Sequence, residues 1–131
     1  MIRERPAGPQ LLEIAREMLL RELAPLLPSE RRGDVLMIAS AMAIAAREAA
    51  AGAAPELAAA AVLRDLYGDD AGGGDAGSGA DGMQRLAADI RAGAFDAPGP
   101  RRSAVHALLW EITKQRLRES NPKLLAAHGL A

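Results

Sequence analysis

Apolar residues recur every three to four positions along most of the chain, which is the period of a helix that buries one side. The first such segment begins near Pro9, and proline suits the first turn of a helix. Its apolar stripe consists of Leu12, Ala15, Leu19, Leu23 and Leu26. Pro25 and Pro28 remove backbone donors, so we predict that this first amphipathic helix loosens and stops there.

Two more helical segments follow, and both end at glycine, a common helix stop. One runs from about Asp34 to Ala51 before Gly52, and the other from Pro55 to Tyr67 before Gly68. The earlier one is apolar around much of its circumference, through Val35, Leu36, Ile38, Ala39, Met42, Ala43, Ile44 and Ala46. A helix with so broad an apolar surface is typical of a buried position, so we expect it to be the most buried helix.

The stretch from residue 69 to residue 82 is rich in Gly and Asp, and it has almost nothing to bury. We predict a flexible linker there. Helical periodicity returns near Asp81 and closes at Gly93. A last helix is expected from Ser103 to the pair Asn121-Pro122, because the residue before a proline disfavours helical geometry.

The amino-acid composition also favours helices over strands. Half of the residues are hydrophobic but only 2% are aromatic, and Ala, Leu, Arg and Glu, which favour helices, dominate over strand-forming types. We therefore predict an all-α protein, a compact bundle of about five helices. Its 131 residues fit a single domain, residues 1–131, with the linker between the third and fourth helices.

Charge and cysteine content exclude several classes of function. Sixteen basic and seventeen acidic residues give a net charge of -1, so no global field favours nucleic acid or a membrane surface. The longest apolar run, residues 35–46, is too short to cross a bilayer. The absence of cysteine removes disulfides and thiolate chemistry, and a cytoplasmic protein is the expectation.

Candidate catalytic and metal-binding patterns are weak. Gly72, Gly74 and Gly77 match a dinucleotide-binding pattern, but no strand precedes them, so we interpret them as linker. The carboxylates Asp69, Asp70, Asp75 and Asp81 match no calcium-loop spacing. Two histidines are too few for a zinc site, and no serine occupies a nucleophile elbow. We expect no catalytic residue, no cofactor and no metal, and we do not expect an enzyme.

Five residues remain as candidate contacts to a partner or ligand: Arg47, Glu48, Arg91, His106 and Trp110. The charged ones end apolar helices, where an ion pair or a helix-end contact is the simpler interpretation and a partner contact the alternative. His106 is interpreted as a surface or half-buried structural residue, with a general base as the alternative. Trp110 is interpreted as core, with a partner-facing anchor as the alternative.

Five short motifs, in this order, resemble a known family of small bacterial proteins. They are Arg5-Pro6 ahead of Leu11-Leu12-Glu13, then Ala46-Arg47-Glu48, Ile90-Arg91-Ala92-Gly93 and Asn121-Pro122-Lys123-Leu124-Leu125. The family is a domain of unknown function, commonly encoded beside aminoglycoside-phosphotransferase-like kinases and acyl-CoA dehydrogenases. Ser40 stands where the family pattern has Asn, and Lys114 where it continues with an apolar residue. The resemblance implies that the gene lies beside genes for such enzymes. It assigns no catalytic residue to this chain.

The leading hypothesis is therefore a non-catalytic accessory or protein-interaction module that binds a protein partner or itself. The resemblance implies a phosphotransferase-like kinase or an acyl-CoA dehydrogenase as that partner. The alternative is an acyl-CoA-type small-molecule binder or minor enzyme, with Arg47, Arg91 and His106 lining a pocket between helices. A pocket that gathers two of these side chains would favour the alternative, and their dispersal would favour the module.

Overall fold

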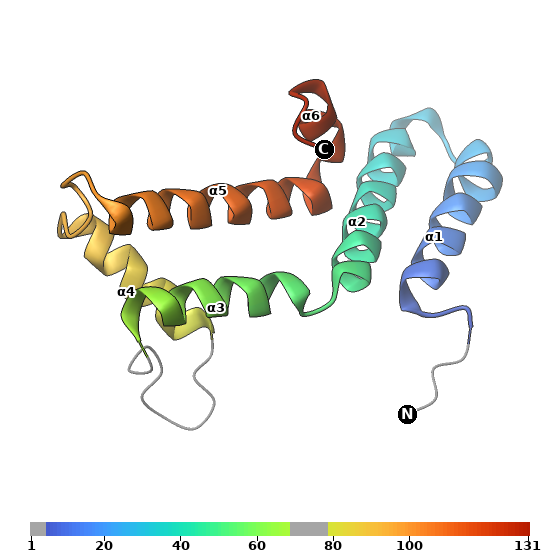
Figure 1. Ribbon diagram of the computed structural model, residues 1–131. Helices are drawn as coiled ribbons and strands as arrows, with labels where there is room; N and C mark the ends of the chain where they lie inside the picture. Colours follow the sequence, from blue (N-terminus) through green and yellow to red (C-terminus); the bar gives the residue numbers. More distant parts are fainter. Residues whose placement is uncertain (1–4, 69–78) are drawn as a thin grey trace. The chain divides into compact units, whose positions relative to one another are not determined.

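The computed structural model describes residues 5–68 and 79–131, and these residues contain helices and no strand (Figure 1). The helices are α1 (Gly8–Met18), α2 (Arg32–Ala51), α3 (Ala54–Tyr67), α4 (Gly79–Arg91), α5 (Pro100–Ser120) and α6 (Pro122–Ala127). A π-helical turn (Leu19–Leu23) and two 3-10 turns (Ala24–Leu26 and Ser29–Arg31) join α1 to α2. The all-α fold class predicted from the sequence is confirmed.

Glycine and proline set several helix ends, as expected. Gly52 and Gly68 follow α2 and α3 with φ angles of 61° and 73°, a region that side chains with a Cβ rarely adopt. Pro55 lies in the first turn of α3, where its missing N–H costs no helical hydrogen bond. Asn121 and Pro122 do more than end α5. The Asn121 side chain accepts a hydrogen bond from the backbone N–H of Leu124 and so begins α6, which the sequence analysis did not predict.

The predicted linker was wrong at its C-terminal end. Residues 79–82 belong to the first turn of α4, whereas residues 69–78 lie outside the described part of the chain. Gly82 is buried, and a Cβ placed on it would stand 3.0 Å from Cδ1 of Leu63 in α3. This glycine therefore permits close packing of α4 against α3, rather than flexibility.

The described residues divide into two compact units, and the prediction of one domain over residues 1–131 stays a prediction. Among the described residues, unit 1 comprises residues 5–52, 118–129 and 131, and unit 2 comprises residues 53–68, 79–117 and 130. Unit 1 thus holds α1, α2 and α6, together with the last residues of α5. Unit 2 holds α3, α4 and the rest of α5.

In unit 1, α1 packs along α2. The buried positions of α2 are Val35, Ala39 and Ala46, and the two alanines are small enough to let a neighbouring helix approach closely. Arg16 of α1 donates from Nε to the backbone carbonyl of Ala39, at 3.1 Å. Leu125 of α6 is also buried within this unit.

The hydrophobic core of unit 2 joins all three of its helices. It consists of Leu63, Leu86, Phe95, Val105 and Leu108, with Ala59, Val62, Leu66, Tyr67, Met83 and Ile112 packed against it. Leu63 and Leu86 have exposed fractions of only 2% and 1%. Aliphatic side chains from α3, α4 and α5 therefore supply most of this core, as the scarcity of aromatic residues predicts.

Candidate interaction surfaces

The five predicted contact residues fall into both units. Arg47 and Glu48 lie at the C-terminal end of α2 in unit 1. Arg91 ends α4, and His106 and Trp110 lie in α5, all in unit 2. Arg47 is half-buried, whereas the other four are exposed. His106 is thus a surface residue, in agreement with its structural interpretation.

Arg47 makes the helix-end contact that the sequence analysis favoured. Its Nε donates to the backbone carbonyl of Glu119, at 2.6 Å. The last carbonyl groups of a helix lack partners within the helix, and a cation near them is stabilised by the helix dipole. Arg47 therefore fixes the C-terminal turn of α5 against α2 within unit 1.

We expect Arg47→Ala to lower the free energy of unfolding by about 1.5 kcal/mol, because hydrogen bonds to charged groups contribute about 1.5–3 kcal/mol and Arg47 is only half-buried. Arg21→Ala is the matched control. Arg21 contacts Glu17 at 3.6 Å with both side chains exposed, so its loss should change stability by less than about 0.5 kcal/mol. Urea unfolding followed by circular dichroism measures both, and equal effects would show that the Arg47 contact contributes nothing.

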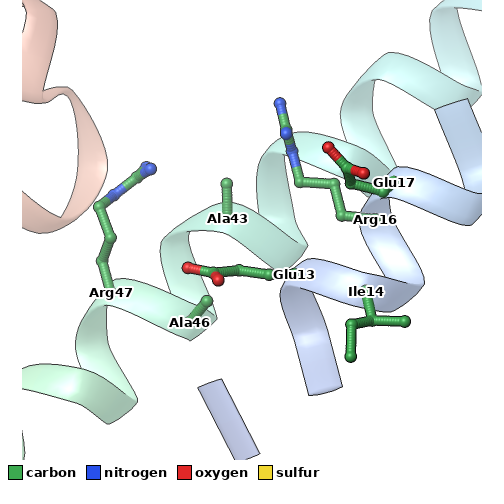
Figure 2. A pocket seen from close by; sticks show the side chains of 7 residues that line it. All are labelled: Glu13, Ile14, Arg16, Glu17, Ala43, Ala46 and Arg47. Carbon is green, nitrogen blue, oxygen red and sulfur yellow. The ribbon is translucent and has the colours of Figure 1, made fainter. Parts of the chain in front are cut away.

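An open groove of about 510 Å³ lies between α1 and α2 (Figure 2). It is lined by Glu13, Ile14, Arg16, Glu17, Ala43, Ala46 and Arg47. Two guanidinium and two carboxylate groups balance one another around a floor of alanine. Such a lining concentrates neither sign of charge, and it lacks the enclosed apolar surface that small-molecule sites use.

The three side chains that the alternative hypothesis would gather in one pocket belong to both units. Arg47 lines the groove of unit 1, whereas Arg91 and His106 are exposed side chains of unit 2. The described residues contain no group of three or more His, Asp or Glu side chains that could hold a metal ion.

One side of α2 is an exposed apolar surface of unit 1. Residues 35–46 carry no charged side chain, yet only Val35, Ala39 and Ala46 are buried among them. Leu36 and Met37 are 58% and 70% exposed, and Ile44 is 36% exposed. The prediction that this helix is the most buried one stays a prediction, but this side of the helix is exposed. We call Leu36, Met37, Ser40, Ala41 and Ile44 the α2 face.

Trp110 does not belong to the core. Its exposed fraction is 47%, because the buried side of α5 runs through Val105 and Leu108. In a helix Trp110 projects about 160° away from Leu108. The interpretation of Trp110 as core was wrong, and its alternative as a partner-facing residue stays open.

Sequence reasoning missed a polar cluster at the contact of α3 and α4. The Tyr67 hydroxyl donates to Oδ2 of Asp89 at 2.6 Å, and the Arg85 guanidinium lies 4.2 Å from the centre of the Tyr67 ring. Burial, the hydrogen bond to Asp89 and the negative charge of Asp89 together raise the pKa of Tyr67 to about 12. Arg85 and Asp89 stand four residues apart on one side of α4, and this spacing was the signal available in the sequence.

Because folding raises the pKa of Tyr67 above its usual value of 10.0, the neutral hydroxyl is stabilised in the folded chain. Stability from this group is complete below pH 10 and is lost as the pH rises toward 12. We expect absorbance at 295 nm to report ionisation of this single tyrosine near pH 12, and Tyr67→Phe to remove its share of the alkaline loss of stability. Ionisation near pH 10 in the folded chain would contradict the contact with Asp89.

No single helix among the described residues is long and apolar enough to cross a membrane. The segments Ser29–Ala51 and Ala54–Tyr67 have the length and apolar composition of a membrane span only when they are taken together, and the helix is broken between them.

Comparison with known proteins gives a family and no activity. No curated protein and no solved structure matches the chain significantly. A family model matches residues 25–124, which include α2 to α5 and the start of α6. The resemblance inferred from the sequence is confirmed to that extent, and the gene neighbourhood stays a prediction. The chain belongs to the family described as a domain of unknown function, DUF6285.

Proposed function

We propose that this chain is a non-catalytic interaction module that binds a protein partner through the α2 face. The observation that carries the proposal is a run of twelve uncharged residues whose outer side is exposed. Monomeric proteins rarely leave contiguous apolar surface open to water unless another molecule covers it. Burying Leu36 and Met37 would remove two of the most exposed large apolar side chains of unit 1 from water.

The α2 face also has the shape of a helix-docking site. Met37, Ala41 and Ile44 follow one another at spacings of four and three residues, so they lie on one side of α2. The small side chains of Ser40 and Ala41 in the middle allow a partner helix to approach closely, with larger side chains at either end. Helix docking in an apolar groove uses anchors with this spacing.

The family resemblance supplies the candidate partners. In bacteria, an acyl-CoA dehydrogenase or a phosphotransferase-like kinase is the enzyme that we propose this module accompanies. We place the complex in the cytoplasm, because a chain without cysteine gains nothing from an oxidising compartment. The module's contribution is binding, and the enzyme supplies the chemistry.

Co-purification from the native host tests this proposal. We expect the tagged full chain to recover one of these two enzymes, and Met37→Asp to reduce that recovery at least about tenfold, because a charge buried without a partner is costly at an interface. Leu57→Asp is the matched control, since Leu57 is 68% exposed but lies in α3. Recovery of neither enzyme, or equal loss with both variants, would contradict the proposal.

A further inference from the structure

The large and small side chains of the α2 face are arranged symmetrically along the helix. Met37 and Ile44 are large, and Ser40 and Ala41 between them are small. Each large residue stands three positions from the nearer small one, so the pattern of sizes reads the same in both directions along α2. At 3.6 residues per turn, all four lie within about 100° of one another around the helix. A surface with this symmetry complements a second copy of itself that runs in the opposite direction.

An antiparallel pair of α2 helices uses this symmetry. When a two-fold axis passes between residues 40 and 41, Met37 of one copy comes level with Ile44 of the other. The small side chains at the axis let the two backbones approach closely, since the distance between packed helices depends on the side chains at their contact. The antiparallel direction also places the N-terminal end of one helix beside the C-terminal end of the other, which the helix dipoles favour.

The contact buries no charged side chain. Residues 35–46 are uncharged, so more than three helical turns can be covered without removing a charge from water. At either end of the pair, Gly33 of one copy comes level with Glu48 of the other, and Glu48 is exposed. Burial of apolar side chains therefore holds the pair together, with no new ion pair required.

We propose that two copies of the chain associate through their α2 faces, antiparallel and about a two-fold axis, when no other partner covers the face. This inference rests on the proposed function, because the same face receives the enzyme, and it adds a control on that binding. Self-association and enzyme binding compete, so dilution or an enzyme that binds more tightly releases the face. One helix of unit 1 from each copy takes part, and the two-fold axis closes the contact.

The size of the α2 face sets the strength of the association. From Leu36 to Ile44 the face spans about 12 Å of helix, at about 1.5 Å per residue. Two such faces bury on the order of 1,000 Å² in total, at the lower limit of specific interfaces, where complexes are weak and transient. We therefore expect a reversible dimer with a dissociation constant between about 10 µM and 1 mM.

Sedimentation equilibrium of the purified full chain tests the association. Over concentrations from about 10 µM to 1 mM, mass action should raise the mass from 13.7 kDa toward twice that value. Met37→Asp should keep the chain monomeric, because each copy would then bury a carboxylate without a partner. Met37 is 70% exposed, so this substitution leaves the fold of unit 1 intact. A wild-type chain that stays at the monomer mass throughout overturns the proposal.

A larger side chain at the axis separates close pairing from general apolar association. Ala41→Leu adds apolar surface, which would strengthen any unspecific contact, but it also blocks the close approach of the two backbones. We expect it to raise the dissociation constant at least about tenfold. Ala58→Leu is the matched control, because Ala58 is exposed in α3, and it should leave the dissociation constant unchanged. Tighter association of the Ala41→Leu chain overturns the proposed packing.

Single cysteines test the direction of the two helices. The chain has no cysteine, so Ser40→Cys introduces the only thiol, close to the axis. Mild oxidation should link it into a disulfide dimer, because Cα atoms less than about 7 Å apart can be bridged. Met37→Cys and Ile44→Cys should link readily when the two chains are mixed, and poorly when each is oxidised alone. Linkage of Met37→Cys alone as fast as in the mixture overturns the antiparallel direction.

The outcomes separate this inference from the proposed function. A chain that recovers an enzyme from the native host but never dimerises overturns the self-association alone. A chain that dimerises through α2 but recovers neither enzyme overturns the proposed function alone. Where an enzyme is recovered, adding it in excess should convert the dimer to a complex with one copy of the chain per site. A dimer that persists on the enzyme overturns the competition for the face.

Discussion

Leu86→Ala is expected to lower the free energy of unfolding by about 3 kcal/mol, within the range of about 2–5 kcal/mol found when a buried leucine is truncated. Leu86 is 1% exposed and belongs to the core that joins α3, α4 and α5 in unit 2. Its truncation removes contacts and leaves a cavity that the neighbouring side chains fill only in part. A loss of this size is a large fraction of the stability of about 5–15 kcal/mol that domains typically possess.

Leu57→Ala is the control for this effect. Both substitutions exchange leucine for alanine within a helix, so the change in helix propensity is the same. Leu57 is 68% exposed, and we expect a change of less than about 0.5 kcal/mol. Urea unfolding followed by circular dichroism at 222 nm compares the two variants. Similar losses at both positions would show that the core of unit 2 is not where the structure places it.

Gly82→Val is the second large effect that we expect, with a loss of about 2 kcal/mol, because added atoms in a packed interior cost about 1–3 kcal/mol. A Cβ at this position already stands 3.0 Å from Cδ1 of Leu63, and Leu63 is only 2% exposed. Leu63 therefore has to shift by a few tenths of an ångström within the core, or α4 has to move away from α3. Valine adds two further methyl groups at the same contact.

Gly33→Val provides the comparison, because Gly33 is also helical but has no atom within 4 Å of an added Cβ. Replacing a helical glycine there should change stability by no more than about 1 kcal/mol, the difference in helix propensity. Thermal unfolding of the two variants measures the contrast. A Gly82→Val chain as stable as Gly33→Val would mean that residues 79–82 behave as the linker that their composition suggests.

The helices were largely predictable because their causes are local. The apolar period and the glycines after residues 51 and 67 define α2 and α3 to within two residues of the observed ends. Gly82 was misassigned because its neighbours in sequence are Gly and Asp, whereas its role depends on Leu63, nineteen residues earlier. α6 was missed because Asn121-Pro122 was interpreted only as a stop, although asparagine followed by proline also begins helices.

The candidate surfaces were predictable only in part. The contact of Arg47 with a helix end follows from its position and was anticipated, although its acceptor on Glu119 is 72 residues away. Packing between distant segments decides which side of an apolar helix is covered, so no local pattern predicts it. For this reason the exposure of Met37 and Trp110 could not be deduced from hydrophobic periodicity.

The proposed function requires the α2 face to be open in the folded full chain, and thiol labelling measures this directly. The chain has no cysteine, so Met37→Cys and Ala39→Cys each introduce a single reactive group into the same helix. Met37 is 70% exposed and Ala39 is 3% exposed. We expect labelling at position 37 within about tenfold of a free thiol, and at position 39 at least about a hundredfold slower, because the latter requires local opening. Equally slow labelling at both positions would show that the α2 face is already covered by the chain itself, and would contradict the proposed docking surface.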